Sequence, residues 1–126
     1  MKKIINSKQA PAPIGPYNQA VLAGNTLYIS GQIALNPQTG NLENQTLEEE
    51  TKRVMKNLQA ILKEAGMDFK NIVKCSIFIS DMDNFSKINE LYAHYFDEKN
   101  APARETVEVS RLPKDVNIEI SAIAVK

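Results

Sequence analysis

The sequence predicts an α+β fold, in which a mixed β-sheet carries two helices packed on one face. The hydrophobic periodicity changes along the chain in the order strands, helix, strand, helix, strands. Two helices are too few to cover both faces of a sheet of this size. The 126 residues fit one domain, residues 1–126, and no linker, repeat or low-complexity run divides them.

Strands and turns are predicted for the first third of the chain. Several prolines make residues 6–16 an extended loop, because proline interrupts regular structure. Gly24-Asn25 separates two apolar runs and is typical of a hairpin turn. Residues 36–40 have the composition of a further turn. The predicted strands cover residues 2–5, 18–23 and 26–34.

The first helix is predicted to begin at Thr46. Thr46 and Glu49 have the spacing of a capping box, and the acidic residues 48–50 suit the positive end of a helix dipole. Gly66 is expected to end the helix. The core-facing stripe comprises Val54, Leu58, Ile61, Leu62 and Ala65.

A strand at residues 71–80 and a second helix are predicted to follow. Asp83 or Asn84 is expected to cap this helix, which continues to about residue 98. Its core stripe comprises Phe85, Ile88, Leu91, Tyr92, Tyr95 and Phe96.

The last two strands each carry a charged residue inside an alternating pattern, Arg104 and Glu119. A Pro-containing turn between them predicts a β-hairpin or a pair of nearby strands. An arginine suits a carboxylate, because its planar donors match two oxygens at once. A glutamate beside such a site can orient or deprotonate a water molecule. The alternatives are a structural ion pair of Arg104 with Glu119 or Glu108, and a solvated strand charge for Glu119.

Both faces of the late strands contain apolar residues, which predicts an oligomer. The helices bury only one face, so a second subunit is expected to cover the other. In the strand at 72–79, the expected opposing faces are Ile72 and Phe78 against Val73, Cys75, Ile77 and Ile79. The last strand has an expected core face of Val116, Ile118, Ile120, Ala122 and Ala124, while its other face includes Ile123 and Val125.

Composition limits the function classes. Fifteen basic and 15 acidic residues give a net charge of zero, so no overall field favours nucleic acid or an anionic membrane. There is no signal-peptide core and no apolar run of membrane length. A lone cysteine cannot form an intrachain disulfide. Together these features predict a cytoplasmic protein.

One cysteine and one histidine also exclude a Cys/His zinc site within one chain. Cys75 alternates with apolar residues in a strand and is expected to be a buried small hydrophobe. His94 lies between aromatic residues in a helical pattern, which favours a packing or solvent-edge role over a serine–histidine triad. No glycine-rich phosphate loop appears.

Short motifs are spread along nearly the whole chain. Near the C-terminus they are Pro102-Ala103-Arg104, the Arg-Leu-Pro-Lys-Asp run at 111–115, and Ile118-Glu119-Ile120. Upstream they are Ile14-Gly15-Pro16-Tyr17, Ser30-Gly31-Gln32-Ile33, the Asn-Pro-Gln-Thr-Gly run at 36–40, and Ile72-Val73-Lys74. In this combination and spacing they resemble the RidA/YjgF family of reactive-intermediate deaminases.

This resemblance implies a chorismate-mutase-like fold that assembles as a homotrimer with a central barrel and inter-subunit sites. It implies hydrolysis of enamine and imine acids, such as 2-aminoacrylate, 2-iminopropanoate and 2-iminobutanoate, to 2-oxo acids and ammonia. The imine carbon is already electrophilic, so neither a metal nor a cofactor is expected. The expected partners are small imino and oxo acids and further copies of the chain, without membrane or nucleic acid.

The resemblance also assigns roles to individual residues. Arg104 is expected to anchor the substrate carboxylate, and Glu119 to orient and partly deprotonate the attacking water. Tyr17 is expected to flank the ligand, with ordinary packing as its alternative. Further expected pocket residues are Ser30, Gly31, Asn89 and Thr106.

The simpler alternatives are a strand end with a turn glycine for Ser30 and Gly31, and a helix-surface amide for Asn89. Thr106 shares a face with Arg104 by strand alternation. Glu105 departs from the family pattern, which usually has a small residue after the arginine. Alternation predicts that Glu105 points away from Arg104.

Two further functions are compatible with the resemblance. A regulatory trimer that binds small carboxylic acids without turnover would need Arg104 but not Glu119. An endoribonuclease or translation inhibitor is another role attached to relatives, but for an endoribonuclease the chain has no basic stripe, no aromatic stacking series and no histidine pair.

Overall fold

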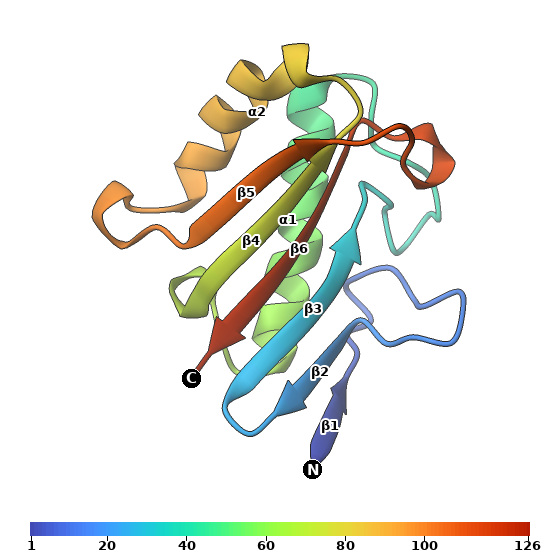
Figure 1. Ribbon diagram of the computed structural model, residues 1–126. Helices are drawn as coiled ribbons and strands as arrows, with labels where there is room; N and C mark the ends of the chain where they lie inside the picture. Colours follow the sequence, from blue (N-terminus) through green and yellow to red (C-terminus); the bar gives the residue numbers. More distant parts are fainter.

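The computed structural model describes residues 1–126 as one six-stranded sheet with two α-helices (Figure 1). The sheet order is β1-β2-β3-β6-β4-β5. The helices are α1 (Leu47–Glu64) and α2 (Phe85–Tyr92). The strands are β1 (Lys2–Ile5), β2 (Ala20–Ala23), β3 (Thr26–Gln32), β4 (Ile72–Ile79), β5 (Ala103–Glu108) and β6 (Ile118–Val125). The predicted α+β class and element order are confirmed.

Of the two arrangements predicted for the last two strands, the hairpin is wrong and the pair of nearby strands is confirmed, because both strands flank β4. Strand β6 lies between β3 and β4 and is antiparallel to both, whereas β5 pairs only with β4, in parallel. Strand β4 therefore separates β5 from β6. An apolar strand such as β4 is best buried in the interior of a sheet. The more exposed β5 takes the edge, reached from β4 through the α2 connection.

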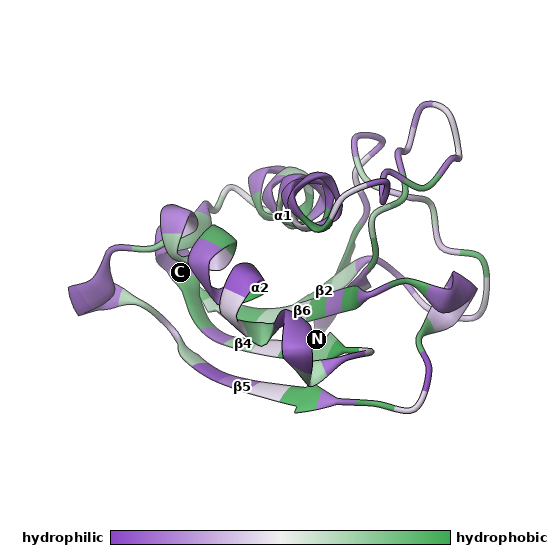
Figure 2. Ribbon diagram, turned by 90° about the horizontal axis from the view of Figure 1, so that it is seen from above, coloured by the Kyte–Doolittle hydropathy of each residue, from purple (hydrophilic) through white to green (hydrophobic).

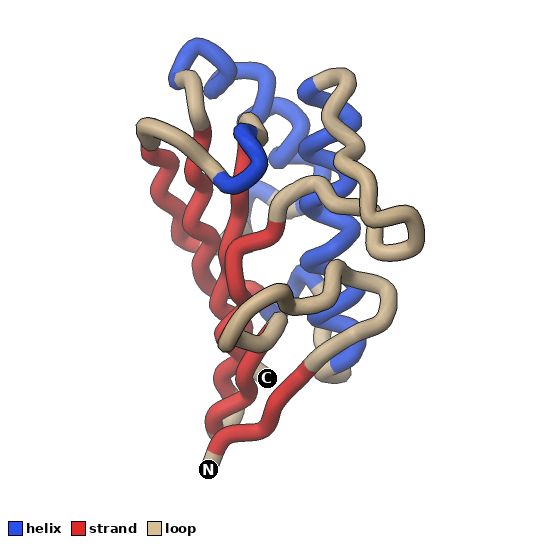
Figure 3. The backbone as a smooth tube through the Cα atoms, turned by 90° about the vertical axis from the view of Figure 1, so that its right-hand side faces the viewer, coloured by secondary structure: helices blue, strands red, loops and turns tan.

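Both helices cover the same face of the sheet (Figures 2 and 3). Strand β6 supplies alternate buried residues to this core, as predicted: Ile118, Ile120, Ala122 and Ala124, preceded by Val116. The predicted faces of β4 need one correction. A register shift between Ile72 and Lys74 buries Ile72 on the helix side and leaves Val73 49% exposed. Such an irregularity reverses the alternation that a sequence pattern assumes.

The cap of α1 follows the prediction closely. The Thr46 side chain accepts a hydrogen bond from the Glu49 N–H at 3.1 Å. The Glu49 carboxylate accepts from the Gln45 N–H, one residue before the expected position. The helix ends at Glu64, and Gly66 adopts a φ of +73°, which suits glycine after a helix.

Helix α2 is shorter than predicted, because it ends at Tyr92 rather than near residue 98. A 3₁₀ turn at Ala93–Tyr95 follows, and Phe96 is extended. Phe69 makes edge-on contacts with the Tyr95 and Phe96 rings, at centroid distances of 5.6 and 5.8 Å. These aromatic contacts stabilise the conformation in which the chain leaves the helix after Tyr92. Asn84 lies at the N-cap without a capping hydrogen bond, while Asp81 caps the preceding turn.

The face of the sheet without helices carries a continuous apolar row. Ile4 pairs with Val21, Val21 with Tyr28, and Tyr28 with Ile123. Ile4 and Tyr28 are 42% and 51% exposed. The predicted second apolar face therefore exists, and we call it the open face. Neither α-helix combines the length and apolar character that crossing a bilayer would demand.

Candidate functional site

Arg104 projects from β5 toward α2, where three side chains hold its guanidinium group. Its Nη1 donates a hydrogen bond to Asn89 Oδ1 at 2.7 Å. The guanidinium carbon lies 5.1 Å from the centre of the Tyr92 ring and 5.8 Å from that of Phe85. Cation–π contacts of this length restrict an otherwise mobile side chain. Arg104 is exposed, so its remaining N–H donors are available to a ligand.

Cys75, Thr106 and Tyr92 are neighbours of Arg104 on this side of the sheet. Arg104 pairs with Cys75 and Thr106 with Ile77, so Arg104 and Thr106 share the helix-side face, as predicted. The hydroxyl oxygen of Thr106 is buried without a hydrogen-bond partner, and the buried Tyr92 hydroxyl has only the Cys75 thiol beside it. Burial raises the pKa of the Cys75 thiol, an effect that the neighbouring Tyr92 side chain and, to a smaller extent, the Arg104 charge oppose in part. Cys75 is the buried residue that the sequence predicted.

Glu119 lies in a separate cavity of about 320 Å³. Tyr17, Gly31 and Lys114 line the same cavity. Its apolar walls come mostly from the loop before β2 and the segment after β3: Pro11, Ala12, Ile14, Ile33 and Leu35. Burial raises the pKa of the Glu119 carboxyl above its usual value. A carboxylate with a raised pKa is a better proton acceptor than an ordinary surface glutamate.

Ser30 and Gly31 form an irregularity in β3 that makes room for Glu119. The register with β6 shifts between Ile29 and Gln32. A Cβ atom on Gly31 would lie 2.6 Å from Glu119 Oε2, so only glycine allows this approach. The Ser30 hydroxyl donates to the Asn18 carbonyl at 2.7 Å and thereby ties the loop that carries Tyr17 to β3. Bulges of this kind are common beside functional sites.

Arg104 and Glu119 lie on opposite faces of the sheet. Arg104 pairs with Cys75 of β4 and Glu119 with Phe78, and these partners are three residues apart. Because side chains alternate along a strand, an odd separation places them on opposite faces. Within one chain there are thus two half-sites, one around Arg104 and one around Glu119. The alternative of an ion pair with Glu119 or Glu108 is wrong, because neither carboxylate contacts Arg104.

Glu105 points away from Arg104, as predicted. It lies on the open face, where its carboxylate binds Lys74 Nζ at 2.8 Å and accepts a hydrogen bond from the Ser76 hydroxyl. These two partners lower the pKa of the Glu105 carboxyl. Glu105 does not compete for the Arg104 guanidinium. His94 is exposed in the turn after α2, which agrees with the predicted solvent-edge role.

Some residues of the half-sites were not singled out by the sequence for function. Phe85 and Tyr92 were assigned to the core stripe of α2, because apolar periodicity does not distinguish a core ring from one that supports a cation. Lys114 sits in a turn at a φ of 56°, which places it at the wall of the Glu119 cavity. The unusual backbone of the Pro-Lys-Asp turn leaves no clear signal in sequence.

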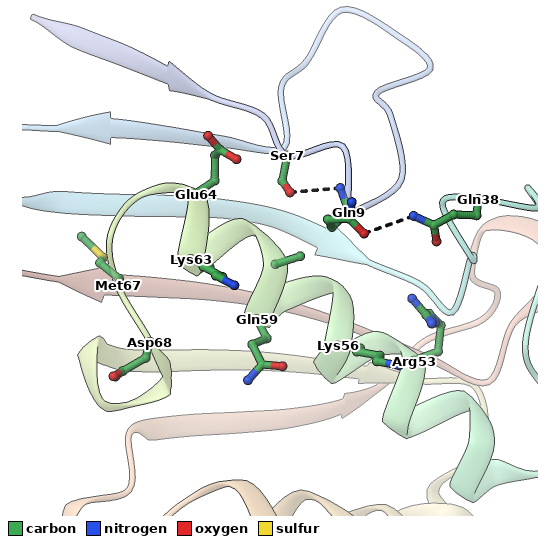
Figure 4. Close-up of a pocket in the computed structure, with 11 residues that line it drawn as sticks. Ser7, Gln9, Gln38, Arg53, Lys56, Gln59, Lys63, Glu64, Met67 and Asp68 are labelled. Carbon is green, nitrogen blue, oxygen red and sulfur yellow. Dashed lines mark hydrogen bonds between the residues drawn. The ribbon is translucent and has the colours of Figure 1, made fainter.

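A larger groove of about 810 Å³ runs along the outer face of α1 (Figure 4). None of the predicted site residues lines it. Arg53, one of its cations, is already bound to Glu43 at 3.2 Å, and the acidic Glu64 and Asp68 offset the others. The groove therefore lacks a converging set of functional groups, and the two half-sites remain the candidates.

Known proteins are similar to this chain in both sequence and fold. The family model described as Endoribonuclease L-PSP matches residues 7–126. A RutC family protein of Pyrococcus horikoshii is 50% identical over 126 residues, which is 100% of this chain and 99% of that protein. The human 2-iminobutanoate/2-iminopropanoate deaminase is 44% identical over 126 residues, 100% of this chain and 91% of that protein.

Solved structures of related proteins have the same fold as this chain. The Rid family protein YyfA of Yersinia pestis superposes with a TM-score of 0.96 at 47% identity, covering 100% of both chains. Escherichia coli TdcF, solved with bound serine, gives a TM-score of 0.92 at 44% identity, covering 98% of both chains. Identity at this level over the whole length, together with the family-model match, shows that the chain belongs to the RidA/YjgF family.

Proposed function

We propose that this protein hydrolyses 2-imino acids, among them 2-iminopropanoate and 2-iminobutanoate, to 2-oxo acids and ammonia. The observation that carries the proposal is the pair of half-sites, a supported guanidinium at Arg104 and a partly buried carboxylate at Glu119. The human, rat and mouse relatives named 2-iminobutanoate/2-iminopropanoate deaminase, at 44%, 47% and 46% identity, support this substrate class.

Arg104 binds the substrate carboxylate in this mechanism. Asn89 and the Tyr92 ring hold the guanidinium in place before the substrate arrives, so little side-chain entropy is lost on binding. Two parallel N–H donors then fix the plane of the carboxylate, and with it the position of the adjacent imine carbon. Orientation of this kind contributes to rate as well as to affinity.

Glu119 activates the water that attacks the imine carbon. As the oxygen–carbon bond forms, the water proton passes to Glu119, the C=N electron pair moves to nitrogen, and Glu119 returns the proton to that nitrogen. In the collapse of the carbinolamine, Glu119 takes the hydroxyl proton and passes it to the amine as the C=O bond forms and the C–N bond breaks, so that ammonia leaves, the 2-oxo acid remains and Glu119 is again a carboxylate. One water molecule is consumed for each ammonia released. The apolar walls of the Glu119 cavity limit access by further water.

The two half-sites of one chain lie on opposite faces, so a complete site requires two subunits. We propose that a homotrimer brings Arg104 of one subunit to Glu119 of the next. The apolar row of Ile4, Val21, Tyr28 and Ile123 on the open face supports such an assembly, because apolar rows of this kind are usually buried. A cyclic arrangement repeats the same contact at each interface.

Subunit mixing tests the activity and the shared site together. The assay generates 2-iminobutanoate with an amino-acid oxidase and follows imine loss with and without the protein. Arg104→Ala and Glu119→Gln should each be inactive alone. If they are unfolded together, mixed equally and refolded, about a quarter of the sites regain both residues, because random assembly pairs subunits independently. Wild-type activity without any recovery on mixing would refute the shared site, and wild type without activity would refute the deaminase.

One observation favours a second candidate, a carboxylate-binding regulatory trimer. TdcF, at 44% identity, was solved with bound serine, which is a small carboxylic acid rather than an imine. A regulatory protein would bind 2-oxo acids through Arg104 but would show no imine hydrolysis. The imine assay separates the two candidates directly.

A further inference from the structure

Glu50 is a fully buried acid that belongs to neither half-site. It lies in the first turn of α1, where the positive end of the helix dipole suits a carboxylate. Its Oε2 accepts hydrogen bonds from the N–H groups of Asn117 and Ile118 at 2.8 and 3.2 Å. Its Oε1 accepts from the Asn117 side-chain amide at 2.8 Å. Burial of an acid is costly without such bonds, so these contacts select one position for the start of β6.

The segment before β6 needs this restraint. Lys114 and Asp115 have φ angles of 56° and 57°, in the left-handed region that residues other than glycine rarely adopt. Such conformations persist only where the surrounding structure holds them. Arg111 holds one side of the turn through two hydrogen bonds to Asp115, at 2.6 and 3.2 Å. Glu50 holds the chain where the turn enters β6.

Glu119 directly follows the two residues that Glu50 binds. Its side chain has little room to move on the Gly31 side. Its carboxylate lies over Gly31, in space that a single added Cβ would fill. A slip of one residue in β6 would move Glu119 to the helix-side face, because side chains alternate along a strand. We propose that Glu50 is a positioning residue that acts through Asn117 and Ile118 to hold Glu119 in its cavity. The kinetic consequence rests on the proposed function, whereas the structural consequence does not.

An isosteric exchange provides the test. In Glu50→Gln, an amide NH₂ would face the Asn117 NH₂, so two donors meet and one contact is lost. Adding Asn117→Asp restores a donor–acceptor pair, while the side-chain oxygen of the introduced glutamine can still accept the two backbone N–H groups. The single variant should therefore release Glu119, and the double variant should restore it. Asn117→Ala, which removes the same side-chain bond without placing two donors against each other, is a milder second variant if Glu50→Gln does not fold.

The first readout is the titration of Glu119, followed by NMR of the carboxyl carbons in the intact protein. The other ionisable groups that line its cavity are Tyr17 and Lys114. Wild type should titrate above the usual glutamate range, because the carboxyl is partly buried. Glu50→Gln and Asn117→Ala should shift the titration toward the ordinary value, and Glu50→Gln with Asn117→Asp should reverse the shift. An unchanged titration in both Glu50→Gln and Asn117→Ala would overturn the inference.

The second readout is imine turnover. Glu50→Gln should lower kcat on the order of 10- to 100-fold, as misplacement of a catalytic group by about 1 Å does. Calorimetry should show 2-oxobutanoate affinity within about twofold of wild type, because Arg104 is untouched and its bonds are what anchor the carboxylate. A parallel loss of binding and turnover that the double variant fails to rescue would show a merely structural role. If wild type hydrolyses no imine, the proposed function fails, while the titration still decides whether Glu50 positions Glu119.

Discussion

Arg104→Ala is the most direct test of the substrate anchor. The substitution removes a guanidinium that Asn89 holds at 2.7 Å and that lies 5.1 Å from the Tyr92 ring. A charge-assisted hydrogen bond contributes about 1.5–3 kcal/mol. Loss of one such bond weakens binding about 10- to 150-fold, and loss of a bidentate pair weakens it further. Because the side chain is exposed, folding stability should change little.

Calorimetry with pyruvate and 2-oxobutanoate measures this loss. Arg104→Lys keeps the charge but not the paired donors, so it should recover only part of the affinity. Lys63→Ala, on the outer face of α1, removes a positive charge from the other groove and should bind like wild type. Equal affinity in wild type and Arg104→Ala would show that the anchor is misassigned. Equal losses in Arg104→Ala and Lys63→Ala would show that overall charge, rather than the site, attracts the ligand.

Two further changes test the Glu119 half-site. Glu119→Gln should lower turnover by about 10²–10⁴-fold and leave 2-oxo acid binding intact, whereas a full rate would assign water activation to another group. Burial raises the pKa of Glu119, so its favourable contribution to folding is present at low pH and is lost as pH rises through that pKa. Glu119→Gln should therefore raise the Tm at pH 7 but not below about pH 4, and an equal rise at both pH values would contradict this linkage. Gly31→Ala should lower kcat with little change in Tm, because its Cβ would displace the flexible end of Glu119 at 2.6 Å. Wild-type kcat in Gly31→Ala would show that catalysis does not need the carboxylate at this position.

Features that depend on interactions between residues close in the sequence could be predicted from the sequence. The cap and the Gly66 end of α1, the hairpin turn at Gly24-Asn25 and the buried face of β6 depend on neighbouring residues and on alternation. The direction of Glu105 away from Arg104 follows from the same alternation. The end of α2 could not be read in this way. The predicted last turn is absent because Tyr95 and Phe96 instead contact Phe69, which lies more than 20 residues earlier in the chain.

The sequence by itself determined which chemical groups the candidate site offers, because an arginine fork and a glutamate carboxylate have the same capacities wherever they lie. Only the tertiary structure decided where they lie. Strand β4 lies between β5 and β6, because an apolar strand buries more of its surface with a neighbour on each side. The register of these strands then places Arg104 and Glu119 on opposite faces of the sheet. Strand order depends on burial between distant segments, which no local pattern records. The division into two half-sites, on which the proposed second subunit rests, is therefore a property of the folded sheet.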